Sequence, residues 1–431
     1  MVDYKIIVAL IVLVFMSVEF LRNKRPYGVT TMACIALLTI TGVIDAPTAF
    51  SGFSDNTTVL VATLLVISSA LVKTSFINNI KAKMAVVQGT KGFLLLLLIC
   101  AFTILLITLL GGMTAVMSIM LMAIMTLSDE SDLSQSRMIF IVGAITCAWY
   151  GRFPIGAGAI LPLQANAIYT GLVNDDPAML LGVYDIFKVG IIPSILMTLY
   201  CIFGWRLIPK NKINTALAGP VHQSENKDLP KYQEYIVYAV FVIVMVSFLF
   251  SSKLGSLIYI LPTIGILVFI YTNTLSIKEV TATLASDMVF MTAGVLVIST
   301  GLGNSGAGQL IGAAVLKILG SNPSSLMVIT VFCIASVIMT TFLSNLGTLA
   351  VMTPIAASTA LAGGMNPKAV VLVVFCSSCL AIAFPTGCAA ATFGFAVGNH
   401  NPVKMLKFTL PFLLIGMVSL IICAEIFYPV Y

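Results

Sequence analysis

Residues 344–348 read Ser-Asn-Leu-Gly-Thr, and this small, mostly polar stretch interrupts an apolar run that holds no charged residue from 318 to 367. A matching run at 92–128 lies in the first half of the chain, with Gly-Gly-Met-Thr at 111–114 near its middle. Each run is too long for one membrane crossing of ~20 residues, yet neither contains a polar loop that could separate two crossings. The pattern therefore predicts helices that enter a membrane, turn at the interruption and leave on the same side.

We expect these two re-entrant hairpins at 92–127 and 324–362. Irregular backbone at membrane depth is tolerated where it is buried in protein or lines an aqueous cavity. Paired interrupted segments, one in each half of a chain, are the best sequence indication of a secondary transporter's binding site. The predicted fold class is an all-α polytopic membrane protein, an inverted-repeat transporter with two re-entrant hairpins and two broken helices.

Composition supports a membrane protein. Hydrophobic residues make up 59% of the 431 and charged residues 9%, where soluble domains carry about 25% charge. The net charge of +6 does not indicate nucleic acid, because the basic residues collect in short loops without interleaved aromatic residues. The sequence contains no nucleophile–base pair, phosphate-binding loop or metal cluster, so we expect neither an enzyme nor a bound cofactor. His222 and His400 lie in predicted loops and are expected to be solvated.

The other apolar segments predict spans near 5–21, 28–44, 57–72, 138–160, 183–205, 233–251, 255–271, 284–302, 369–398 and 409–427. The polar linker 206–232 divides them into a first repeat, 1–205, and a second repeat, 233–431. The predicted broken span is 138–160 in the first repeat and 369–398 in the second.

Charge predicts the orientation. If the linker is cytoplasmic, 16 of the 22 Lys and Arg residues lie on the cytoplasmic side, in agreement with the positive-inside rule. The two hairpins then open to opposite sides, which is the property of an inverted repeat. We expect a multi-pass plasma-membrane protein with both termini outside.

The second hairpin tip offers Ser344, Asn345 and Thr348 at a helix interruption. Free N–H groups at a helix start suit a carboxylate, and free carbonyls at a helix end suit a sodium ion. The alternative is a turn whose polar atoms satisfy only its own backbone. In the first tip, Thr114 is the remaining polar side chain.

Two further candidates lie in the broken spans. Arg152 could bind an anionic substrate through its guanidinium, since charges inside a span are costly and usually functional. The alternative is that Arg152 extends to an interface. In 369–398, Pro385-Thr386-Gly387 interrupts the helix and frees carbonyls, while Thr386 and Cys388 add side-chain groups.

At these residues the chain resembles the divalent anion/sodium symporter family, the dicarboxylate and citrate carriers of the ion transporter superfamily. Residues 341–354, TFLSNLGTLAVMTP, are similar to that family's second hairpin tip, and 52–74 to its early span. The resemblance implies that Ser344 and Asn345 contact substrate carboxylate and that Asn345, Thr348, Thr386, Gly387 and Cys388 help to hold sodium. It also implies a homodimer and an elevator movement of the hairpins and broken helices.

The sequence departs from that family's motifs. The first tip is Gly112-Met113-Thr114, and the second has Leu346 where the family has threonine. Because side-chain oxygens are lost and Arg152 could supply positive charge, we expect a carrier of small di- or tricarboxylates with reduced sodium dependence, Na⁺ remaining a candidate coupling ion. The expected partners are a small anionic substrate and the lipid bilayer. The alternatives are an inorganic anion or oxyanion permease and a non-transporting regulatory relative.

Overall fold

Every regular element in the described part of the chain is a helix. The computed structural model describes residues 4–22, 24–75, 92–125, 133–155, 157–174, 176–213, 229–249, 254, 257–320, 323–342, 345–385 and 387–430. The first half contains α1 (Tyr4–Arg22), α2 (Tyr27–Ile40), α3 (Ala46–Ser54), α4 (Asn56–Val72), α6 (Phe93–Leu110), α7 (Met113–Met125), α8 (Gln135–Trp149), α9 (Ala157–Tyr169), η2 (Thr170–Leu172), α10 (Asp185–Gly204) and η3 (Trp205–Leu207). The second contains α11 (Lys231–Leu249), α13 (Leu257–Tyr271), α14 (Ile277–Leu284), α15 (Asp287–Ser305), α16 (Ala307–Leu319), α17 (Ser325–Phe342), α18 (Asn345–Ala362), α19 (Pro367–Ser378), α20 (Ala389–Val397) and α21 (Pro402–Phe427).

Six helices or helix pairs among the described residues are long and apolar enough to cross a membrane. They are Ala46–Leu71, Phe93–Leu110, Asp185–Leu207, Ile277–Ser305, Asn345–Ala362 and Pro402–Phe427. Large apolar side chains are exposed on their outer faces, for example Phe203 on α10 and Ile426 on α21. In water such exposure would be costly, whereas against lipid tails it is favourable.

The helix interruptions lie where the sequence predicts them. α6 ends at Leu110, and Gly111 adopts φ 65°, a left-handed conformation that glycine reaches without steric cost, before α7 begins at Met113. In the second half, α17 ends at Phe342 and α18 begins at Asn345. The predicted span 138–160 is broken between α8 and α9, but its second helix continues to Tyr169, beyond the predicted end.

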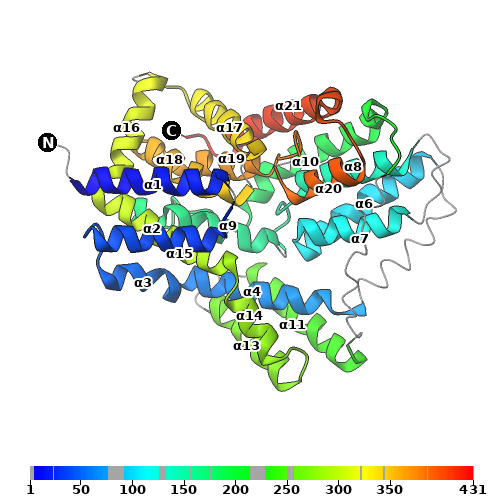
Figure 1. Ribbon diagram of the computed structural model, residues 1–431, viewed down its shortest axis with the longest axis horizontal. Helices are drawn as coiled ribbons and strands as arrows, with labels where there is room; N and C mark the ends of the chain where they lie inside the picture. Colours follow the sequence, from blue (N-terminus) through cyan, green and yellow to red (C-terminus); the bar gives the residue numbers. More distant parts are fainter. Residues whose placement is uncertain are drawn as a thin grey trace.

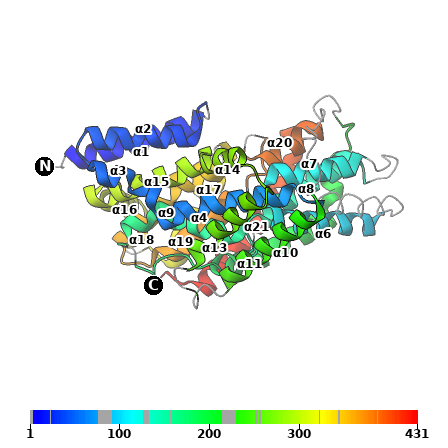
Figure 2. The ribbon, with the colours of Figure 1, turned by 90° about the horizontal axis from the view of Figure 1, so that it is seen from below.

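The two halves of the chain interleave. α2 packs along α15, α8 along α20 and α10 along α21, so each pair joins a first-half helix to a second-half helix. At the α8–α20 crossing, Gly143 lets the helices approach so closely that a Cβ there would lie 3.0 Å from the Ala390 carbonyl oxygen. Figure 1 shows α6, α7, α8 and α20 at one end of the molecule and α1, α16 and α18 at the other, and Figure 2 shows the same separation from below.

His400 is buried, contrary to the expectation of a solvated residue. It lies between α20 and α21, where its Nε2 is 3.0 Å from the Ser136 carbonyl oxygen and its Nδ1 is 3.1 Å from Asn211 Nδ2. Burial lowers the pKa of the imidazole, and the neighbouring positive charge of Arg137 lowers it further. His222 lies outside the described residues.

A polar cluster joins the starts of α10 and α19 to the end of α21. The buried carboxylate of Asp185 pairs with Lys368 Nζ at 2.7 Å and accepts hydrogen bonds from the Tyr428 hydroxyl, at 2.6 Å, and from the Gly182 N–H, at 2.7 Å. Three partners on separate segments are thus held by one side chain, which indicates a structural role for this acidic residue.

We expect Asp185→Asn to destabilise the protein by about 2 kcal/mol, because it removes the ion pair and leaves the partly buried ammonium of Lys368 without a counter-charge. Tyr428→Phe, which removes one hydrogen bond, should cost about 1 kcal/mol. The measurement is the temperature at which the detergent-purified protein loses its monodisperse elution peak. Equal midpoints for Asp185→Asn and wild type would contradict the structural role.

Candidate functional site

The two predicted tips meet at one cavity. It has a volume of about 490 Å³, which is within the range of about 300–1,000 Å³ of small-molecule sites. The lining residues come from both halves of the chain and are Tyr27, Leu65, Leu110, Gly111, Gly112, Met113, Thr114, Tyr150, Ile160, Leu161, Gln164, Asn345, Leu346, Cys388 and Ala389. Residues more than two hundred positions apart in the sequence thus line one cavity.

Asn345 connects the tips directly. Its Nδ2 lies 3.9 Å from the sulfur of Met113, the first residue of α7. Its Oδ1 accepts from the Thr340 hydroxyl at 3.3 Å, and the same hydroxyl donates to the Ser378 carbonyl at 2.5 Å. The Asn345 side chain thus contacts the start of α7 and the end of α17. The end of α19 acts on it indirectly, through the Thr340 hydroxyl.

The first turns or caps of three helices line this cavity, together with the C-terminal ends of α6, at Leu110 and Gly111, and of α8, at Tyr150. Thr114 lies in the first turn of α7, Asn345 and Leu346 begin α18, and Cys388 is the N-cap of α20. None of these first turns carries an acidic residue. By contrast, the N-terminus of α2 at Tyr27 is already bound by the carboxylate of Asp287, whose oxygens accept from the N–H groups of Tyr27 and Gly28.

The electrostatics of the cavity therefore come from backbone dipoles. Within the described part of the chain, no lining residue carries a formal charge. Helix N-termini present unsatisfied N–H groups and partial positive charge, which favours an anion. The arrangement can bind a small anion without a buried arginine or lysine in direct contact.

Gln164 is the residue that the sequence analysis missed. It lies on α9, is 4% exposed and lines the cavity, and neither its Nε2 nor its Oε1 has a hydrogen-bond partner among the described residues. Leaving buried polar atoms without partners costs about 1–3 kcal/mol per group. A lone glutamine in the apolar segment 157–169 was the available signal, but the predicted span ended at 160.

Arg152 is buried elsewhere. Its side chain is 2% exposed and does not line the cavity. Its Nε donates to the Ala148 carbonyl and its Nη2 to the Cys376 carbonyl, both at 3.1 Å. Its Nη1 has no partner among the described residues. A Cβ at Gly190 would lie 2.7 Å from its side chain, so α10 closes the space around it. The guanidinium thus joins the ends of α8 and α19, and its direct contact with substrate stays a prediction.

The remaining predicted site residues divide into three groups. Thr114, Asn345 and Cys388 line the cavity. Thr348 and Gly387 do not: Thr348 is fully buried with its hydroxyl unpartnered among the described residues, and Gly387 lies against the backbone of Ala381. Ser344 and Thr386 lie outside the described residues.

Cys388 faces a second thiol. Its Sγ lies 3.4 Å from Cys147 Sγ on α8 and accepts from the Ala391 N–H of α20. Of the nine cysteines, all free, eight are buried and Cys388 alone is partly exposed. Sulfur is a weak, soft acceptor, so this position provides a poor ligand for a hard sodium ion.

The fold and the cavity define a polytopic helical membrane transporter. Comparison with known families agrees, since the model of the CitMHS family, described as a citrate transporter, matches residues 10–374 and 257–430. The chain belongs to the CitMHS citrate transporter family, within the ion transporter superfamily. This is a family of transporters, and the chain is a multi-pass membrane protein.

Two solved structures share the fold. The chain is similar to YdaH of Alcanivorax borkumensis, a transporter, with a TM-score of 0.60 and 12% identity over 96% of this chain and 99% of that one. It is similar to MtrF of Neisseria gonorrhoeae, described with a class of antimetabolite efflux pumps, with a TM-score of 0.57 and 16% identity over 86% and 82%.

One curated relative matches part of the sequence. It is the uncharacterized transporter sll0640 of Synechocystis, 27% identical over 137 residues, which are 32% of this chain and 22% of the relative. The matched region thus spans about a fifth of that relative's length.

Proposed function

We propose that the protein is a secondary-active carrier of small organic anions, of the di- or tricarboxylate type, which bind in the cavity between the two tips. The observation that supports it most is that the starts of three helices meet at one cavity, where no lining residue among those described carries a charge. One carboxylate would accept N–H groups from the starts of α7 and α18. Thr114, Asn345 and the Gln164 amide would bind the remaining oxygens, with apolar contact from Leu161 and Leu346.

The proposal includes the membrane arrangement. α6–α7 and α17–α18 would be re-entrant hairpins of opposite direction, in repeats 1–205 and 233–431 joined by the cytoplasmic linker 206–232, with both termini outside. The hairpins and the broken pairs α8–α9 and α19–α20 would move together as an elevator in a homodimer. Arg152 would hold the two broken pairs in register, since it bonds the carbonyl oxygens of both α8 and α19.

We further propose reduced sodium dependence. The expected sodium ligands include Thr348, whose buried hydroxyl is free to act as a ligand, but Asn345 Oδ1 already accepts from Thr340 and Cys388 presents sulfur. Sodium prefers several oxygen ligands, and this set supplies few. The helix dipoles would provide positive potential that a bound sodium ion provides in related carriers.

Uptake by the purified protein in liposomes tests the function. We expect saturable uptake of citrate, succinate or malate, and replacement of Na⁺ by K⁺ on both sides should lower the initial rate by less than about threefold. Asn345→Ala should lower uptake about tenfold, because a positioned hydrogen bond to an anion is lost. A strict Na⁺ requirement would overturn the reduced dependence, and uptake of sulfate alone would favour the inorganic-anion alternative. Absence of uptake and of ligand-induced stabilisation with all these anions would indicate a non-transporting relative.

A further inference from the structure

A second cavity lies near the C-terminal end of α18, between η2, the end of α15 and the start of α16. Its volume is about 420 Å³, and it is lined by Gly171, Leu172, Asn174, Gly303, Asn304, Gly308, Gln309, Ser358, Leu361 and Ala362. None of these residues lines the first cavity. α18 contributes Asn345 and Leu346 to the first cavity and Ser358, Leu361 and Ala362 to the second, so the two spaces are separated along this helix.

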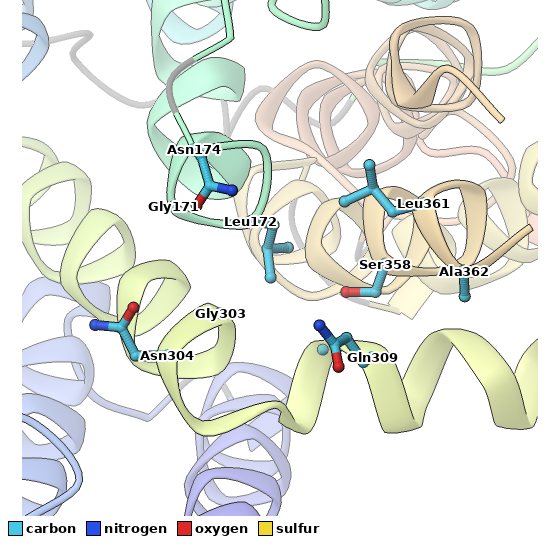
Figure 3. Close-up of a pocket in the computed structure, with 10 residues that line it drawn as sticks. Gly171, Leu172, Asn174, Gly303, Asn304, Gln309, Ser358, Leu361 and Ala362 are labelled. Carbon is cyan, nitrogen blue, oxygen red and sulfur yellow. The ribbon is translucent and has the colours of Figure 1, made fainter. Parts of the chain in front are cut away.

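Polar groups surround the second cavity. Figure 3 shows Ser358 of α18 close to Gln309 of α16, while Asn174 lies farther away and the carboxamide of Asn304 on α15 is directed away from this pair. The rim residues Asn174, Asn304 and Gln309 are exposed, whereas Ser358 is 3% exposed at the inner end. The opening thus leads from three carboxamides to one buried hydroxyl.

The Ser358 hydroxyl has no hydrogen-bond partner among the described residues. Glycine at 308 leaves room beside this buried hydroxyl, because a Cβ there would lie 2.9 Å from Ser358 Oγ and 2.8 Å from Leu172 Cδ2. A buried hydroxyl without a partner is costly, and the cost is recovered when a ligand or water supplies the missing bond.

The chemistry of the walls favours a neutral ligand. Among the described residues no lining side chain is charged, and the cavity lies where the C-terminus of α15 meets the N-terminus of α16, so opposite dipole ends offset each other. Each carboxamide offers both a donor and an acceptor.

We propose that this cavity binds a small neutral solute that carries several carboxamide or hydroxyl groups. The inference goes beyond the proposed function and does not depend on it, because it concerns a separate site and a ligand of different charge. Since α18 contributes to both cavities, a solute bound here contacts the helix whose first turn forms the transport site.

Binding is tested on the full-length protein in lipid nanodiscs, where no sugar detergent competes. The probes are succinamide and ribitol, with succinate as the charged counterpart of succinamide, and the readout is the thermal midpoint as a function of probe concentration. We expect saturable stabilisation by at least one neutral probe. Ser358→Ala and Gln309→Leu should each weaken its apparent affinity about five- to tenfold, since each removes one hydrogen-bonding group.

Two variants serve as controls. Ser336→Ala removes another buried hydroxyl without a partner among the described residues, on α17 and outside both cavities, and should leave the affinity unchanged. Asn345→Ala alters the first cavity and should also leave it unchanged. The proposal is overturned if neither neutral probe stabilises the protein. It is also overturned if Asn345→Ala weakens binding of the neutral probes and Ser358→Ala does not. A third contrary outcome is that Ser358→Ala weakens the binding of succinate rather than that of the neutral probes.

Discussion

Replacement of Gln164 by leucine should make the protein more stable and nearly inactive. In the ligand-free state the variant no longer buries two unpartnered amide atoms, so its unfolding free energy should rise by about 1–3 kcal/mol. The carboxylate substrate would lose the amide that contacts it within the cavity, and we expect carrier-mediated uptake to fall about a hundredfold. Initial uptake rates in liposomes and the thermal midpoint in detergent measure the two effects together.

Gln233→Leu is the matched control. Gln233 is buried to a similar extent, at 6% exposed, but its Nε2 donates to the carbonyl oxygens of Thr272 and Asn273. This variant should lose stability and keep transport, the reverse of Gln164→Leu. If Gln164→Leu transports at the wild-type rate, the α9 amide does not bind substrate and the proposed site is wrong.

Modification of Cys388 should strongly inhibit transport, and bound substrate should prevent the inhibition. This thiol lines the cavity at the start of α20, whereas the other eight cysteines are buried and inert to water-soluble reagents. A maleimide adds to the thiol and fills part of a 490 Å³ space, so we expect uptake to fall by about tenfold or more. The measurement is uptake after reaction, with mass spectrometry to locate the adduct.

Cys388→Ser provides the control, because it preserves the shape of the site and removes the nucleophile. Its uptake should be insensitive to the reagent. In the wild-type protein, the transported anion should protect Cys388 from the maleimide. The anion concentration that gives half-maximal protection should match the one that gives half-maximal uptake. Full transport by protein whose Cys388 is quantitatively modified would place the substrate elsewhere.

The sequence predicted the interruptions correctly because their cause is local. A Gly-Gly pair and a Ser-Asn-Leu-Gly-Thr stretch inside apolar runs disfavour continuous helix, and Gly111 at φ 65° shows the conformation that only glycine adopts readily. The membrane class follows from composition in the same way, and both the family match and the fold comparisons agree. His400 was placed wrongly, since its burial depends on Ser136 and Asn211, which lie far away in the sequence.

The binding cavity could be predicted only in part. Thr114, Asn345 and Cys388 stand beside interruptions, so local sequence indicated them. Gln164 stands inside a regular helix, and its importance follows from the absence of partners in the packed structure. Arg152 showed the opposite difficulty: a charge in an apolar segment suggested ligand contact, yet carbonyl oxygens of α8 and α19 surround it.

Hydropathy, charge placement and turn-forming residues act over a few positions, and from them alone this chain is an all-helical membrane protein with two interrupted segments. Which helix ends converge, and which polar side chains are left without partners, depends on contacts between distant segments such as Met113 with Asn345 and Cys147 with Cys388. These contacts are set by how whole helices pack across the two halves. For that reason the place of Gln164 beside the two tips, and the second cavity, became visible only in three dimensions.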